Sequence, residues 1–272
     1  APAPRGPPPP PPPAAAPPSA SASPTAATAA TASADPTERP TTKDPLQELA
    51  EAATAAAARP APDVRDGQFV HTRTVERIDG GSACVRKVWS SADGRSEGLI
   101  VDPWHGTMKL SGNRQNVPPS LAEPTYRYLA ALPTDPDKLL PLLRAGAGSS
   151  SKDQDLDPDL VAFREAESLL TTQLMPPAVG AAFCRTVATL PGVSVVPDAV
   201  DLLGRHGIGV TGEDGTDRVQ LIFDRNTCEL LGDKRVRLVD TSAQGGLRAG
   251  AASEEAIVLR AVTDRAGQET EG

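Results

Sequence analysis

Four aspartates stand at alternate positions in one short segment, a spacing that calcium-binding loops use to surround the ion with carboxylate oxygens. They are Asp153, Asp155, Asp157 and Asp159. Counted from Asp153, however, the sixth position is Pro158 in place of glycine, and the twelfth is Arg164 in place of a bidentate acid. We therefore interpret the segment as a solvated linker that ends in a helix N-cap, and we expect no metal site there.

The three histidines, His71, His105 and His206, lie in unrelated sequence contexts. None is spaced i,i+2 or i,i+4 from another, as a metal-binding pair requires. The chain also has no GxSxG nucleophile elbow, no phosphate-binding GxxxxGKS/T loop and no GxGxxG after a strand. We expect no catalytic residue, no metal and no cofactor. An enzyme whose site is assembled from distant residues, such as His71, His105 and nearby acids, is the least favoured alternative.

The three cysteines are Cys84, Cys184 and Cys228, and they form no CxxC or zinc-ligand spacing. We interpret all three as small buried hydrophobic residues, with a Cys84 to Cys228 bridge between strands as the open alternative. Because their number is odd, at least one thiol stays free if the protein is exported.

Aromatic residues are few, and all the tryptophans and tyrosines fall in or just after the first expected run of strands. These are Trp89, Trp104, Tyr126 and Tyr128. Most such residues belong to a core, but on a sheet that faces a helical cover they can also line an apolar ligand pocket. They are the ligand-binding residues that the sequence predicts.

The net charge is −8, and no cluster of lysine and arginine offsets it. An acidic chain without a basic patch is poorly suited to neutralise phosphates, so we expect no nucleic-acid partner and no docking to anionic lipid headgroups. No apolar run is long enough to span a membrane, and the given amino terminus lacks a signal-peptide pattern. We expect contact with a membrane only through an anchor that is missing from this chain.

Composition divides the chain into three parts. Residues 1–43 are rich in proline, alanine, serine and threonine and include the consecutive prolines 7–13, which predicts a disordered tether with a polyproline II segment. Residues 44–268 should form a single α+β domain, and residues 269–272 a disordered tail.

Alternating β-branched and charged residues with Gly-containing turns predict strands, and apolar residues at helical spacing behind Asp-Pro pairs predict helices. The expected strands are 68–79, 83–91, 98–102, 107–110, 193–196, 206–211, 219–224, 228–239 and 256–263. The first expected helix starts near Leu46, and three more span about 135–145, 157–174 and 177–190. This order suggests one curved antiparallel sheet, split by a three-helix insertion that covers one face.

One longer segment, PPSLAEPTYRYLAALPTDP at 118–136, resembles a stretch shared by a family of uncharacterised membrane-anchored proteins of high-GC Gram-positive bacteria. Four further stretches resemble the same family in order, and the similarity covers about residues 46–268. They are Met175–Val179, Leu190–Asp198, Gly204–Gly207 and Leu221–Asp224.

This resemblance implies a transmembrane helix before the domain and a gene often placed beside that of an extracytoplasmic-function sigma factor. The order of strands and helices is also distantly similar to the half-barrel of LolA-type lipoprotein carriers and RseB-type regulators, which implies an apolar cleft. We therefore expect a non-catalytic sensor, regulatory or binding domain on the extracytoplasmic face of the membrane, with a lipid-like ligand or a protein partner. The alternative is a structural ectodomain without a small ligand.

Overall fold

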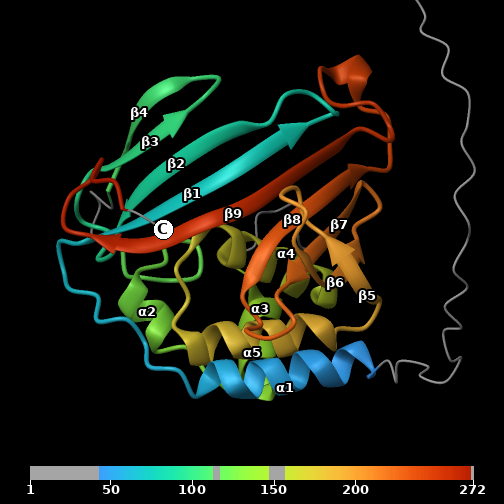
Figure 1. The fold of residues 1–272 in the computed structure, drawn as a ribbon, viewed down its shortest axis with the longest axis horizontal. Helices are drawn as coiled ribbons and strands as arrows, with labels where there is room; N and C mark the ends of the chain where they lie inside the picture. The colour runs from blue at the N-terminus through green and yellow to red at the C-terminus, as the bar shows by residue number, and fades with distance from the viewer. Residues whose placement is uncertain (1–42, 113–116, 147–156, 271–272) are drawn as a thin grey trace, which may run out of the picture. The chain divides into compact units, whose positions relative to one another are not determined.

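A computed structural model describes residues 43–112, 117–146 and 157–270 of the chain (Figure 1). Its strands form one antiparallel sheet that does not close on itself, in the order β4-β3-β2-β1-β9-β8-β7-β6-β5. Their bounds are Phe69–Ile78 (β1), Cys84–Ser91 (β2), Gly98–Asp102 (β3), Gly106–Leu110 (β4), Ser194–Val200 (β5), His206–Glu213 (β6), Asp217–Phe223 (β7), Leu230–Arg237 (β8) and Ala252–Thr263 (β9). The expected α+β class with a large antiparallel sheet is confirmed.

The hairpin of β1 and β2 forms at the turn that the sequence predicts. Asp79 and Gly80 both have positive φ, 48° and 71°, and the Gly81 N–H donates to the Ile78 carbonyl at 2.9 Å. Two central residues with positive φ match the right-handed twist of the flanking strands. On its other side β1 pairs with β9, from Phe69 opposite Thr263 to Ile78 opposite Ser253. The last strand therefore joins the two runs of strands into one sheet.

Five helices accompany the sheet in the described residues. They are Pro45–Ala57 (α1), Tyr126–Ala130 (α2), Pro136–Ala145 (α3), Pro158–Thr172 (α4) and Pro177–Ala188 (α5). An aspartate side chain caps α1, α3 and α4 by accepting from a backbone N–H of the first turn, with proline as the first helical residue. The expected helices are confirmed, and the short helix α2 is one that the sequence analysis missed.

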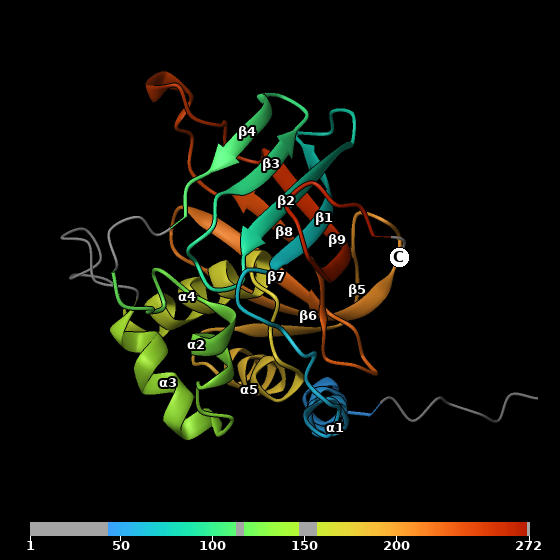
Figure 2. The same cartoon turned by 90° about the vertical axis from the view of Figure 1, so that its left-hand side faces the viewer.

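The helices pack against strands β6–β9 around one shared core (Figure 2). Leu139 of α3, Phe163 of α4 and Phe183 of α5 join Leu221 and Phe223 of β7 in that core. Helices α3, α4 and α5 thus cover the β6–β9 part of the sheet, because their apolar stripes and the inward residues of these strands leave water together. The inserted segment holds four helices in the described residues, α2 to α5, where the sequence predicts three.

A glycine lets α4 approach the sheet closely. A Cβ at Gly212 of β6 would lie 3.0 Å from the Phe163 ring. Gly207, Gly209 and Gly212 have GxGxxG spacing, yet all three lie inside β6. A Cβ at Gly207 would lie 2.4 Å from the Phe223 carbonyl oxygen of the paired strand. These glycines therefore serve packing within the sheet and against α4.

Helix α1 packs along α5 and buries Leu49, Ala52, Ala53 and Ala56. Leu46, near which the sequence predicts the start of this helix, is 39% exposed.

The carboxyl-terminal segment crosses β1 and β2. Trp89 Nε1 donates to the Gln268 carbonyl at 2.8 Å, and Lys87 pairs with Glu269 at 2.6 Å. His71 Nδ1 lies 3.1 Å from Thr270 Oγ1. Packed residues thus continue to 270, two positions beyond the expected boundary at 268. Residues 1–42, which hold most of the expected tether, lie outside the described ranges.

Candidate ligand-binding cavity

A cavity of about 280 Å³ lies between the connection from α4 to α5, the end of α1 and strands β8 and β9. This volume is at the lower end of the range for small-molecule sites, about 300–1,000 Å³. Much of its wall is apolar. The apolar residues include Leu170, Leu174, Met175, Leu230, Ile257 and Leu259.

Arg260 of β9 brings a positive charge to this wall. Its Nη2 donates to the carbonyl oxygens of Leu170 and Thr171, at 2.8 Å for the latter, in the last turn of α4. Helix carbonyls at this end have no partner within the helix and carry the negative end of the helix dipole, so a guanidinium is favourable there. Burial nevertheless lowers the pKa of Arg260 to about 10. Its buried Nε has no hydrogen-bond partner in the part of the chain that the structure describes.

Arg205 reaches the same cavity from the loop before β6. Its Nε donates to Asp201 at 2.7 Å, and its Nη2 donates to the carbonyls of Leu231 and Ile257 at 2.8 and 2.9 Å. The Asp201 side chain is fully buried. Arg205 therefore ties β8 and β9 to the loop, and Asp201 neutralises its charge.

Arg59 and Glu229 form the polar rim. Arg59 Nη1 lies 2.8 Å from Glu229, and both side chains are largely exposed. The cavity thus gathers three guanidinium groups, from Arg59, Arg205 and Arg260, against the two paired carboxylates of Asp201 and Glu229. One positive charge is left over, in a protein whose net charge is −8.

The first turn of α5 also lines the cavity, through Pro177 and Gly180. The N-cap of α5 is Pro176, which makes no side-chain cap hydrogen bond. The positive end of the helix dipole at this 12-residue helix is therefore not neutralised by an acidic cap, in contrast to α1, α3 and α4.

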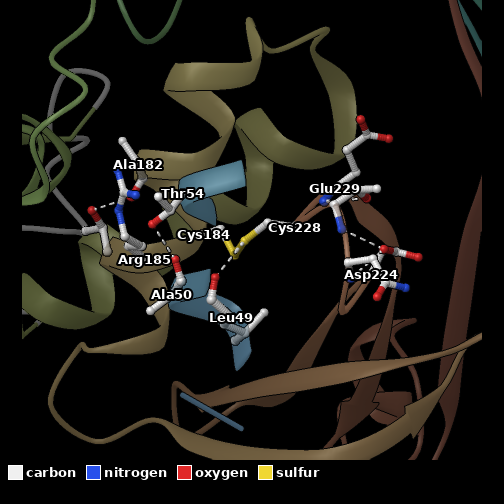
Figure 3. The surroundings of a disulfide bond; sticks show 12 residues. Leu49, Ala50, Thr54, Ala182, Cys184, Arg185, Asp224, Cys228 and Glu229 are labelled. Carbon is white, nitrogen blue, oxygen red and sulfur yellow. Dashed lines mark hydrogen bonds between the residues drawn. A yellow bond between two sulfur atoms is a disulfide. The ribbon is translucent and has the colours of Figure 1, made fainter. Parts of the chain in front are cut away.

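A disulfide bond between Cys184 and Cys228 fixes the wall of the cavity (Figure 3). It joins α5 to the turn between β7 and β8, and Cys228 Sγ lies 3.7 Å from the Leu49 carbonyl oxygen of α1. The sequence interpretation of three free buried cysteines is wrong, and so is the alternative Cys84 to Cys228 bridge. Cys84 is free and partly exposed at the start of β2, opposite Glu76 of β1.

The four aromatic residues that the sequence predicts as ligand contacts do not line this cavity. Trp89 is 1% exposed and stacks on His71, with ring centroids 4.4 Å apart. Tyr126 is buried and donates to the Pro62 carbonyl at 3.1 Å. Tyr128 packs at the margin of the core, and Trp104 is 48% exposed beside the turn from β3 to β4. The structure therefore disperses them over the β1–β4 half and α2.

The histidines occupy three separate surroundings. His105 Nδ1 lies 2.9 Å from Asp102, and His206 Nδ1 lies 2.9 Å from Asp198, in both cases with an exposed imidazole. His71 is fully buried, and burial lowers its pKa. Within the described ranges no group of three or more His, Cys, Asp or Glu side chains is placed to hold a metal ion.

The aspartate-rich segment lies only partly within the described residues. Asp153 and Asp155 lie outside the described residues. Asp157 caps α4 by accepting from the Asp159 N–H, as predicted, and Asp159 accepts from Arg144 of α3 at 2.8 Å.

A second, acidic pocket of about 250 Å³ lies on the helix-covered face of the sheet. Glu76 of β1 stands opposite Glu255 of β9, which stands opposite Asp233 of β8, and Glu167 of α4 faces them. Burial, with the neighbouring acids adding to it, raises the pKa of Asp233 to about 8 and that of Glu255 to about 7. In the described part of the chain neither of these two carboxyl groups has a hydrogen bond or an ion pair. At neutral pH Asp233 is therefore largely protonated and Glu255 about half protonated.

Sequence reasoning missed the arginines of the cavity and the acids of this pocket. One signal was present for Arg260, which interrupts the otherwise apolar run Ala256–Val262. No local pattern marks Asp233, because its neighbours lie on other strands, and the carbonyl partners of Arg205 on β8 and β9 are likewise distant in the sequence.

Comparison with protein-family models, with curated proteins and with solved structures finds no match for this chain. None of the helices in the described residues is long and apolar enough to cross a membrane. Function is therefore inferred from the geometry of the molecule itself.

Proposed function

We propose that this protein is a non-catalytic binding domain of the sensor or regulatory type, which takes a small, largely apolar ligand into the cavity between α4, α5, β8 and β9. The cavity is the observation that carries this proposal. Its apolar wall lies between a helical layer and the sheet, where a ligand can leave water without disturbing the main core. The alternative, a structural ectodomain without a small ligand, would be favoured by an interior without a cavity, and this region contains one.

The disulfide supports an extracytoplasmic location. Bonds of this kind persist in oxidising compartments and are rare in the bacterial cytoplasm. Cys184 and Cys228 are 44 positions apart and join two layers of the domain, so the bond constrains a long loop of the unfolded chain. Attachment to a membrane through an anchor, and a link to an extracytoplasmic-function sigma factor, are the parts of the proposal that rest on the family resemblance.

The arrangement of layers supports the proposed likeness to LolA-type carriers and RseB-type regulators. An open antiparallel sheet carries helices on one face, and the cavity lies between the two layers. In such an arrangement a ligand that enters the cavity changes the contact between α4 and the sheet. That change is one that a partner protein can detect on the outside of the domain.

Native mass spectrometry of the full chain after gentle purification tests the proposal. We expect a mass above that of the polypeptide, or uptake of an added fatty acid at one copy per chain. Gly180→Leu serves as the blocked variant, because Gly180 lines the cavity, and Gly180→Ala is its matched control with one added methyl group. A bare polypeptide mass that takes up no amphiphile, in both the natural protein and the control, would show that the proposed ligand class is wrong.

A further inference from the structure

We propose that the ligand is a single-chain amphiphile with an anionic head, and that Arg260 binds the head while the wall of the cavity holds the chain. This inference rests on the proposed function and names the ligand class of the same cavity. Its support comes from charge, from hydrogen bonding and from volume, and each is independent of the apolar character of the wall.

The charge of Arg260 is not matched by a carboxylate. Arg205 pairs with Asp201, and Arg235 pairs with Glu167 and Asp217. No acidic group lies within ion-pair distance of Arg260 in the ranges that the structure describes. A largely buried cation loses several kcal/mol of hydration, and the helix carbonyls, with Glu255 and Glu229 acting from beyond ion-pair distance, return only part of it. An anion in the cavity supplies the missing partner.

The hydrogen-bonding capacity of Arg260 is also incomplete. A guanidinium has five N–H donors, and the buried Nε–H of Arg260 has no acceptor within the described residues. Its Nη1 also has no hydrogen-bond partner in the described residues and, unlike Nε, is not buried, so it can donate to a carboxylate or phosphate in the cavity. A hydroxyl head accepts fewer bonds and leaves the charge unbalanced.

The neighbouring groups reinforce the same sign of charge. The uncapped first turn of α5 directs the positive end of its dipole toward this region. The charge of Arg205 on the same wall is already matched by Asp201, and Glu229 at the rim is held by Arg59 at 2.8 Å. A cationic amphiphile therefore meets the charge of Arg260 and a positive helix end, and is repelled.

The volume sets the number of chains. At about 280 Å³ the cavity is smaller than most small-molecule sites. It fits one short or medium alkyl chain, and a lipid with two long chains does not fit inside it. A fatty acid and the phosphate-headed fragment of a lipid share the required chemistry.

Isothermal titration calorimetry of the full chain with four eight-carbon probes tests the inference: octanoate, octyl phosphate, octanol and octyltrimethylammonium. We expect the two anions to bind at least about tenfold more tightly than octanol, which corresponds to about 1.4 kcal/mol, and the cation not to bind. The tighter of the two anions identifies the source of the head group. Equal affinity for octanol and octanoate would overturn the inference and leave the proposed apolar site intact. Failure of all four probes to bind would overturn both.

Variants assign the effect to the arginines. Arg260→Gln should lose about tenfold in octanoate affinity and keep its octanol affinity, whereas Arg248→Gln, an exposed arginine with the same change in charge, should change neither. Arg260 also holds the end of α4, so its replacement can destabilise the fold. A second pair of variants, at the exposed rim, therefore gives an independent test. Glu229→Gln should tighten octanoate binding and Arg59→Gln should weaken it, each by about threefold. The proposal would be wrong if the octanoate affinity were unchanged in Glu229→Gln and Arg59→Gln, or in a folded Arg260→Gln. Such a result would show that no anionic head binds beside Arg260.

Discussion

Asp233 of β8 stands directly opposite Glu255 of β9, and both carboxyl groups lie in the pocket that α4 covers. Like charges at paired positions of an antiparallel sheet repel one another. The sheet tolerates this pair because burial raises both pKa values, so that near neutral pH Asp233 is largely protonated and Glu255 about half protonated. Arg86, Arg235 and Arg260 are the cations nearest to these acids, with Glu76 and Glu167 as the other acids that face them.

The raised pKa values predict that alkaline pH destabilises the protein. A carboxyl group with a higher pKa in the folded than in the unfolded state favours folding below the unfolded value, near 4, and this contribution is lost as the pH rises to the folded value. We expect Asp233→Asn to reduce the fall in the free energy of unfolding between pH 5 and pH 8 by roughly 2–4 kcal/mol.

Urea titrations at several pH values give this difference. His71, whose pKa is lowered, has the opposite pH dependence at mildly acidic pH, and it affects natural protein and variant alike. An identical pH profile for the two proteins would mean that Asp233 ionises normally in the fold.

Removal of the disulfide should lower stability strongly. The bond closes a loop between positions 44 apart, for which the chain-entropy treatment gives a loss of about 2–4 kcal/mol. We expect Cys184→Ser with Cys228→Ser to lower the free energy of unfolding from urea titration by that amount, while Cys84→Ser, the matched control, leaves it unchanged. Thiol titration of the unfolded, unreduced natural protein should find one reactive group. Three reactive groups would contradict the Cys184–Cys228 bond.

Gly212→Ala should be destabilising even though glycine itself is a poor strand residue. The added Cβ would lie 3.0 Å from the Phe163 ring, so α4 must move away from β6. Overpacking of this kind costs about 1–3 kcal/mol. In the background Phe163→Leu the cost of Gly212→Ala should fall by at least about half, which a double-mutant cycle measures as coupling. Strict additivity of the two substitutions would argue against the close contact.

Tryptophan fluorescence distinguishes the aromatic site that the sequence predicts from the cavity that the structure contains. Trp89 is 1% exposed and Trp104 is 48% exposed, so acrylamide should quench only Trp104 efficiently. Neither ring lines the cavity. Saturation with octanoate should therefore leave the emission of Trp104→Phe, which reports Trp89 alone, unchanged. A shift of that emission on binding would favour the aromatic residues as the ligand site.

The sequence by itself determined the local structure. Asp44, Asp135 and Asp157 before prolines start α1, α3 and α4, and Asp79-Gly80 forms the first hairpin turn, because caps and turns depend on residues within a few positions. The alternation of apolar and polar residues placed the nine strands for the same reason. It missed α2, whose five residues carry too little periodic signal.

Only the tertiary structure decided which distant groups meet. The pairing of β1 with β9, the bond from Cys184 to Cys228, the position of Arg260 at the end of α4 and the row of acids around Asp233 all join residues far apart in the chain. The spacing of such residues along the sequence carries no information about their distance in space. That distance is set by the packing of helices on the sheet and by the order of the strands. The cavity and its charge arise from that packing.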